Sequence, residues 1–434
     1  MFKLEFDWED PGKAKGDELR ATWSRFAIKV DGHYVTRVTD LSLRSVRDAV
    51  YLPLYPLAEW IAENWFFLQF EAHTYESREA FWRRHSFVWA DSGYSFPQFL
   101  IQPTGLHTDL VWIPKYKGYS TIEYLGKGSS TSLTSQVIDE LRNLLDAVNG
   151  RLESFGIFGT HFQNEWRFIS EMNSDEIDFA RMAASSGIDP FNMEESIEEG
   201  IILLSQKLPL ESLARFLTAT RGSHFSDRAL WLDKSLTQLD RLKGGLSAIP
   251  SIVAKSNKLR LNQEKKKAPF QWGYDVARKI RSEFSLHNDP VPSVANLASL
   301  FGVHEFEDSI LIDREAFSQV RSLSTGGQNP RFKITTRRPD SDTFALARGI
   351  FDRITAPELS VNVVADTDLE ADKASRAFAA EFLLPSSVLR ERQAKSQENV
   401  WYEDDVLELA EEYHVSEYVV RHQLENHNIG HIVS

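Results

Sequence analysis

A basic run near the middle of the chain constrains the fold more than any other feature. Residues 254–270 read AKSNKLRLNQEKKKAPF, where six lysines and arginines are offset only by Glu264. Such a run is typical of a solvated linker or an exposed helix face. Single cores stop growing at roughly 250 to 300 residues. For this chain of 434 residues we therefore predict an N-terminal domain at 1–253, a basic linker at 254–268 and a C-terminal domain at 269–434.

The overall composition describes a folded, acidic protein. Hydrophobic residues make up 42% of the chain and charged residues 26%, which lacks the signature of disorder. The formal net charge of -14 argues against bulk attraction to nucleic acid or to anionic membranes. Any basic surface must therefore be local. The basic run is either a solvated linker or a nucleic-acid contact through Lys265, Lys266 and Lys267.

The chain contains no cysteine, which excludes disulfides, thiolate zinc sites and cysteine nucleophiles. Any metal would need His, Asp or Glu ligands. No segment approaches the roughly 20 apolar residues that cross a bilayer, and the N-terminus MFKLEFDWEDPGK lacks the apolar core of a signal peptide. We expect a cytoplasmic protein that does not contact membranes.

The N-terminal half mixes strand and helix patterns. In FAIKVDGHYVTRV two β-rich runs flank Asp31-Gly32, a dipeptide suited to a tight hairpin turn. The segment PLAEWIAENWFFLQFE has apolar residues at helical spacing and predicts a deeply buried helix. Further strands are predicted in FPQFLIQP and LVWIPK, followed by a long amphipathic helix that ends near Gly156. The fold class is α+β, with a small antiparallel β element and long helices, followed by a mainly helical C-terminal part with a small sheet.

The segment DTFALARGIFDRI places Phe344, Ala347, Phe351 and Ile354 on one stripe, which predicts a core helix. The same segment resembles a helix of the ImmA/IrrE family of bacterial zinc peptidases, which reads approximately R-F-x-L-A-H-E-L-G-H. Phe344 and Ala347, with Leu346 between them, match the flanks of that motif in order.

The residues that carry the chemistry in the family are replaced in this chain. A zinc peptidase of this type needs two His at i and i+4 on one helix face, with a Glu between them as general base. Arg348 stands at the first His position, Gly349 at the Glu position and Asp352 at the second His position. The segment DKASRAFAAEFLLP resembles the helix that supplies the third zinc ligand, and Asp372 occupies that position.

The resemblance covers about Pro269 to His431, with further similar blocks at 271–303 and 404–429. It implies a zincin-like fold and, because of the replacements, a pseudo-peptidase with no catalytic residue, no metal and no cofactor. Active relatives cleave helix-turn-helix repressors. We therefore predict a binding or regulatory protein in bacterial stress response, mobile-element control or phage defence, whose partner is a protein such as a helix-turn-helix regulator.

Two hypotheses describe Arg348, which lies one helical turn from Asp352. In the first, its guanidinium takes the place of the zinc cation and bridges Asp352 and Asp372. In the second, Arg348 extends from a shallow cleft into solvent.

Two further functions remain as alternatives. One is a zinc-dependent endopeptidase with a site rebuilt from Asp352, Asp372 and a histidine such as His304. The other is a nucleic-acid-binding regulator that uses the basic run and the helix-turn-helix outline of LAEEYHVSEYVVRHQL near the C-terminus. Structural roles are favoured over metal ligation for six other histidines: His85, His107, His161, His422, His427 and His431.

Overall fold

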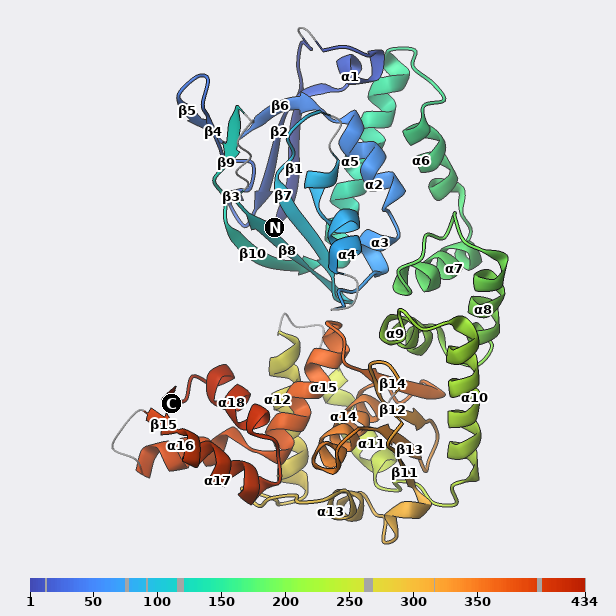
Figure 1. Ribbon diagram of the computed structural model, residues 1–434, viewed down its shortest axis with the longest axis vertical. Coiled ribbons are helices and arrows are strands. Elements are labelled where there is room, and N and C mark those ends of the chain that lie inside the picture. Colours follow the sequence, from blue (N-terminus) through green and yellow to red (C-terminus); the bar gives the residue numbers. More distant parts are fainter. Residues whose placement is uncertain are drawn as a thin grey trace. The chain divides into compact units, whose positions relative to one another are not determined.

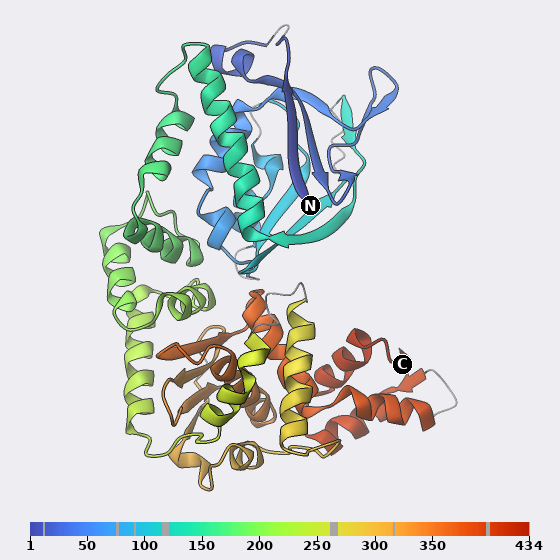
Figure 2. The same ribbon diagram turned by 180° about the vertical axis from the view of Figure 1, so that it is seen from behind.

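Two compact units make up the chain, residues Met1–Met193 and Glu194–Ser434. The computed structural model describes residues 1–11, 14–74, 78–90, 93–114, 121–260, 268–315, 317–395 and 400–433, with the backbone alone at 255–260. Figures 1 and 2 show the elements of each unit from two sides. Among the described helices, none is both long and apolar enough to cross a lipid bilayer.

The N-terminal unit is built on small antiparallel sheets. One sheet has the order β1-β2-β3 with β6 also paired to β2, another has the order β10-β8-β7, and a third has the order β5-β4-β9. The strands are β1 (Phe2–Trp8), β2 (Trp23–Val30), β3 (His33–Tyr34), β4 (Val38–Asp40), β5 (Ser45–Arg47), β6 (Val50–Pro53), β7 (Gln98–Pro103), β8 (His107–Ile113), β9 (Ile122–Tyr124) and β10 (Gly128–Leu133).

The predicted hairpin is present where expected. Asp31 and Gly32 both have positive φ, 47° and 84°, which is the backbone geometry of a two-residue turn between twisted strands. The turn sets the register in which Val30 faces His33 across β2 and β3. The α+β class predicted from the sequence is confirmed.

Helices cover the sheets of the N-terminal unit. The long helix α5 packs against β1, as both views show. The predicted buried helix is divided into α2 and α3, and its stripe of Leu57, Trp60, Ile61, Trp65 and Leu68 is buried as expected. The helices are α1 (Asp17–Ala21), α2 (Tyr55–Glu63), α3 (Phe67–Phe70), α4 (Arg78–His85), η2 (Phe87–Trp89), α5 (Thr134–Ser154), α6 (His161–Glu171) and α7 (Ser174–Ser185).

The C-terminal unit contains a mixed sheet of order β11-β13-β12-β14, in which only β11 and β13 run parallel. A two-stranded parallel sheet, β15 with β16, lies near the C-terminus. The strands are β11 (Ile310–Asp313), β12 (Val320–Thr325), β13 (Phe332–Thr335), β14 (Val361–Ala365), β15 (Val400–Tyr402) and β16 (His431–Val433).

Helices make up most of this unit. They are α8 (Glu195–Ser205), α9 (Leu210–Ala219), α10 (Phe225–Arg241), α11 (Ile249–Arg260), α12 (Pro269–Glu283), α13 (Val294–Leu300), η3 (Phe306–Asp308), η4 (Pro339–Ser341), α14 (Asp342–Thr355), α15 (Glu370–Leu383), α16 (Ser386–Lys395), α17 (Glu403–Tyr413) and α18 (Glu417–Asn426).

The mixed sheet is covered on both faces. Phe332 of β13 lies against α14, where it approaches Gly349, whereas the adjacent Lys333 faces α10. Successive residues of a strand point to opposite faces, so the sheet lies between α14 and α10. The fully buried ammonium of Lys333 donates to Ser235 at 2.9 Å and pairs with Asp313 at 2.8 Å, which neutralises a charge that would be costly alone.

The division of the chain lies about sixty residues earlier than the boundary predicted from the basic run. Helices α9 and α10 pack on the mixed sheet and α11 packs on α14, so residues 194–260 join the C-terminal unit. These helices bury apolar residues such as Phe216 and Leu232 in that unit. The predicted linker at 254–268 contains residues 261–267, which lie outside the described residues, as do Lys265, Lys266 and Lys267 themselves.

Candidate functional site

Helices α14 and α15 carry the four residues that the sequence singled out. The side chains of Arg348 and Asp352 on α14 and of Asp372 on α15 are all buried, with no more than 3% of any of these residues exposed. The two helices pack against each other, and α14 also lies on the sheet. The fold therefore brings these positions together in a dry environment, where charges need partners.

Gly349 fits closely against the sheet. A Cβ atom added at this position would lie 2.6 Å from the Ser322 hydroxyl of β12 and 3.2 Å from the Phe332 ring of β13. The first distance is shorter than real Cβ contacts, so a larger residue requires the Ser322 side chain or its surroundings to shift. Position 349 is therefore closely packed, and a glutamate there would have to displace these neighbours.

A residue from a distant helix joins the two carboxylates. Arg215 of α9 donates one hydrogen bond to Asp352 Oδ1 at 2.7 Å and another to Asp372 Oδ1 at 2.7 Å. The Arg215 side chain is 12% exposed, compared with 4% for Asp352 and 0% for Asp372. Arg215 is thus the cation that bridges both carboxylates.

Each carboxylate is also held by neutral donors. Asp352 Oδ2 accepts from the Asn362 amide at 3.0 Å, and Asp372 Oδ1 accepts from the backbone N–H of Ala365 at 3.0 Å. Asp372 Oδ2 accepts from the Thr367 hydroxyl. Hydrogen bonds to the charged form stabilise a buried carboxylate. Both aspartates therefore have donors on each of their oxygens.

The electrostatics of Arg215 reflect this arrangement. Burial by itself lowers the pKa of the guanidinium, but the charges of Asp352 and Asp372 outweigh burial and raise its pKa above the ordinary value. The arginine therefore remains charged across the accessible pH range.

Arg348 has different partners from those we predicted. Its guanidinium pairs with Asp366, donates to the Ala365 carbonyl oxygen and donates to Ser375 Oγ at 3.1 Å. It lies 3.7 Å from Asp372, a longer approach than that of Arg215. The hypothesis that Arg348 bridges the carboxylates is therefore corrected, and the alternative that it extends into solvent is also wrong because the residue is 2% exposed.

Asp366, directly after β14, balances the charge of Arg348. It also pairs with Arg321 of β12 at 2.5 Å. Burial raises the pKa of Asp366, but the charges of Arg348 and Arg321 outweigh it and the net pKa lies below the ordinary value. The local cluster therefore consists of matched guanidinium and carboxylate groups.

Glu381 of α15 has a structural role. Its buried carboxylate accepts from Arg278 of α12 at 2.8 Å, from the Ser386 hydroxyl at 2.9 Å and from Gln423 of α18 at 3.0 Å, and the His427 ring lies 3.3 Å away. One side chain therefore connects α15 to three other helices, α12, α16 and α18. This accounts for a charged residue in the middle of the FAAEFLLP pattern.

The candidate histidines do not join the aspartates. His304 is exposed, His422 packs on Tyr418, and His431 is exposed on β16. In the N-terminal unit, His85 is buried against Phe81 and bonds Ile101 and Glu71, a structural arrangement. Within the described ranges, no three His, Asp or Glu side chains are grouped so that they could hold a metal ion.

Sequence reasoning missed Arg215 and Asp366. Arg215 lies in LESLARFLTA, where it follows the pattern of an ordinary amphipathic helix. No local spacing connects it to α14 or α15, because the contact spans 137 and 157 positions. The predicted boundary also placed Arg215 in a different domain from both aspartates.

Comparison with known proteins supports the resemblance for part of the unit. Residues 356–425 match the family model of the IrrE N-terminal-like domain. The match begins directly after α14 and includes Asp372, whereas Arg348, Gly349 and Asp352 precede it. No curated protein and no solved structure matches the chain. The C-terminal unit thus contains an IrrE N-terminal-like domain at residues 356–425, as the resemblance to the ImmA/IrrE family predicts.

Proposed function

We propose that this chain is a non-catalytic ImmA/IrrE-like protein that acts by binding a protein partner. One observation carries the proposal: Arg215 lies between Asp352 and Asp372, two of the positions at which the family's zinc ligands stand. A guanidinium in this position supplies the positive charge that would otherwise come from a metal.

The residues at this site do not fit a zinc ion. Zinc is bound by lone pairs of His, Cys or carboxylate groups, and a guanidinium has none to give. The Oδ1 atoms of Asp352 and Asp372 both accept hydrogen bonds from Arg215. Arg348 adds a second positive charge 3.7 Å from Asp372. Gly349 offers no general base, and a glutamate there would have to displace its neighbours.

Charge favours a protein partner over nucleic acid at the C-terminal helix pair. Helix α17 has the sequence EDDVLELAEEY, with six acidic residues and no lysine or arginine. Such a surface repels phosphate. The nucleic-acid alternative then depends on the basic run. From the family resemblance, the proposal includes a cytoplasmic role in stress response, mobile-element control or phage defence. It also includes a helix-turn-helix regulator as the partner.

Metal analysis of the purified full-length protein tests the proposal. We expect well under one equivalent of zinc by elemental analysis, and no cleavage of candidate partner proteins with added Zn, Mn or Co. Asp352→Asn and Asp372→Asn serve as matched variants. Stoichiometric zinc that either variant loses would contradict the proposal and favour the zinc-dependent endopeptidase.

A salt titration separates the two classes of partner. Binding that depends on phosphate contacts weakens steeply with rising salt, because counterions are released on binding. We expect no such binding to duplex or single-stranded oligonucleotides by the isolated 194–434 unit. Tight, salt-sensitive binding that Lys265→Gln, Lys266→Gln and Lys267→Gln together abolish would favour the nucleic-acid regulator.

A further inference from the structure

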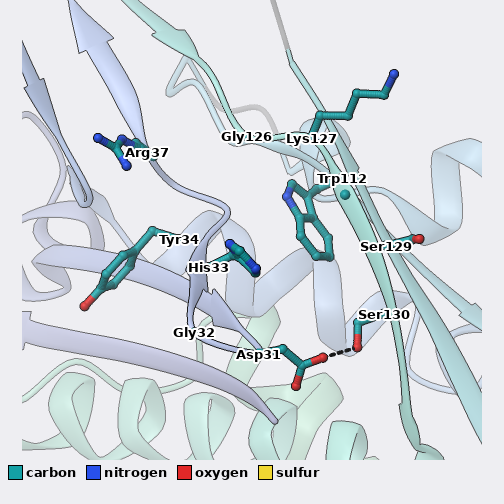
Figure 3. Close-up of a pocket in the computed structure, with 11 residues that line it drawn as sticks. Asp31, Gly32, His33, Tyr34, Arg37, Trp112, Gly126, Lys127, Ser129 and Ser130 are labelled. Atoms are coloured by element: carbon teal, nitrogen blue, oxygen red, sulfur yellow. Dashed lines mark hydrogen bonds between the residues drawn. The ribbon is translucent and has the colours of Figure 1, made fainter.

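A pocket of about 420 Å³ lies in the N-terminal unit, between the β2–β3 hairpin and the segment that leads into β10. Figure 3 shows His33 on the hairpin side facing Trp112 on the other side, and the long side chains of Arg37 and Lys127 extend outward from the rim. This volume lies within the range of about 300 to 1,000 Å³ that small-molecule sites occupy.

The wall formed by Trp112 is rigid and closely packed. The residue is 4% exposed, and its indole lies directly against the main chain of Gly126 and Gly128. A Cβ at Gly126 would lie 3.2 Å from the indole Cδ1, and one at Gly128 would clash with the ring. Because neither glycine has a side chain, the Trp112 ring packs directly on the main chain at this wall of the pocket.

Positive charge dominates the lining. Arg37 and Lys127 are cationic, and His33 becomes so when protonated, whereas Asp31 is the acidic residue among the lining side chains. Asp31 is already engaged, because it pairs with the N-terminal amino group and accepts from Ser130 Oγ at 2.5 Å, as drawn in Figure 3. The N-terminal amino group and Ser130 therefore offset part of its negative charge, which also acts on His33.

The two permanent cations are weakly compensated. Arg37 approaches Asp48 at 3.7 Å, with 60% and 46% of the two side chains exposed, and such pairs contribute little in water. Lys127 has no ion pair within the part of the chain that the structure describes. In a protein of net charge -14, a concave site with uncompensated positive charge departs from the average surface.

We propose that this pocket binds a phosphate-bearing anion through Arg37, Lys127 and His33. A guanidinium matches the geometry of two phosphate oxygens, and an ammonium contributes a point charge beside it. A free nucleotide and the backbone of a single strand present the same phosphate chemistry, and the experiment separates them. The proposal is independent of the C-terminal unit, because each of these residues belongs to the N-terminal one.

Isothermal titration of the full-length protein with pyrophosphate, ATP and a short single-stranded oligonucleotide tests this site. We expect binding of at least one of these probes with one equivalent per chain, weakened by added salt. The tightest probe identifies the source: ATP or pyrophosphate indicates a small ligand, and the oligonucleotide indicates a strand. Absence of measurable binding for all three at millimolar concentration overturns the proposal.

Matched variants locate the binding. Arg37→Gln and Lys127→Gln should each weaken binding about tenfold, as expected for loss of a charge-assisted hydrogen bond. Arg25→Gln is the control, because Arg25 of β2 meets Asp7 at a similar 3.6 Å but does not line the pocket. Ser129→Glu, at an exposed lining position, adds a negative charge and should weaken binding without unfolding. Equal affinities across all four variants, with unchanged circular dichroism, would place the ligand elsewhere and refute the site.

Discussion

Arg215 and Asp372 stand 157 positions apart in the sequence, yet the guanidinium of one lies 2.7 Å from the carboxylate of the other. The contact links helix α9 to helix α15. Through this contact, a residue upstream of the basic run neutralises carboxylates that are buried in the C-terminal unit.

Removal of Arg215 should destabilise the C-terminal unit strongly. Arg215→Ala leaves Asp352 and Asp372 buried without their shared cation, and breaking such a pair costs about 3 to 5 kcal/mol. Urea denaturation measures the loss. Arg241→Ala, at an exposed position of α10, is the control and should change stability by less than about 0.5 kcal/mol.

A double-mutant cycle should distinguish Arg215 from Arg348. Asp352→Asn retains the shape of the side chain and should recover part of the loss caused by Arg215→Ala, because neighbours in one network couple. Asp352→Asn combined with Arg348→Ala should instead be nearly additive, since Arg348 pairs with Asp366. Strong coupling of Arg348 with Asp352 in urea denaturation would revive the original bridging hypothesis.

Position 349 should not accept a side chain. Gly349→Ala forces a Cβ against Ser322 and should destabilise the protein by about 1 to 3 kcal/mol, the cost of overpacking a core. Gly150→Ala is a matched helical control, because nothing lies within 4 Å of a Cβ there, and it should stabilise by roughly 0.5 to 1 kcal/mol. Thermal unfolding of both variants tests the contrast; a neutral Gly349→Ala would show that β12 yields easily.

Stability at acid pH should depend on Glu381. Burial raises the pKa of this carboxyl, but His427 and Arg278 outweigh burial and leave its folded pKa below the ordinary value. The stabilising contribution is therefore fully present above the unfolded pKa of about 4.3 and is lost as pH falls through the lower folded pKa.

Glu381→Gln should accordingly cost about 2 kcal/mol near pH 6 and progressively less below about pH 4. Urea midpoints measured at a series of pH values provide the readout. The exposed Glu411→Gln is the control, and its effect should stay small throughout. A deficit for Glu381→Gln that stays constant down to pH 2 would contradict the argument.

The helices before the basic run should be required for folding of the C-terminal unit. A fragment of residues 194–434 retains Arg215 and the partners of Lys333 on α10, whereas a fragment of 269–434 lacks both. We expect a cooperative thermal transition for the longer fragment and none for the shorter one by circular dichroism. A stable 269–434 fragment would restore the boundary that we predicted from composition.

Local patterns predicted much of this structure. The Asp31-Gly32 turn, the buried stripe from Leu57 to Leu68 and the burial of α14 each depend on residues a few positions apart, and each is present. Periodicity and turn chemistry are local properties, so they can be deduced from one sequence.

The partners of the charged groups could not be predicted in the same way. Spacing places Arg348 and Asp352 one turn apart on α14, but it does not reveal that Asp366 and the Ala365 carbonyl lie beside Arg348. The compact units divide the chain earlier than the boundary that we predicted, for a related reason. The boundary was predicted from the cluster of charges at 254–270. The packing of α9, α10 and α11 on the C-terminal unit depends on contacts that composition does not encode.

The distance along the chain between Arg215 and Asp372 has a consequence for biosynthesis. At about 5 to 20 residues per second, the ribosome needs roughly 8 to 30 seconds to add the 157 positions that separate them. During that interval α9 has been made, but Asp372, one of the two carboxylates that its guanidinium bridges, has not. The C-terminal unit therefore completes this charge pairing only after Asp372 has been translated.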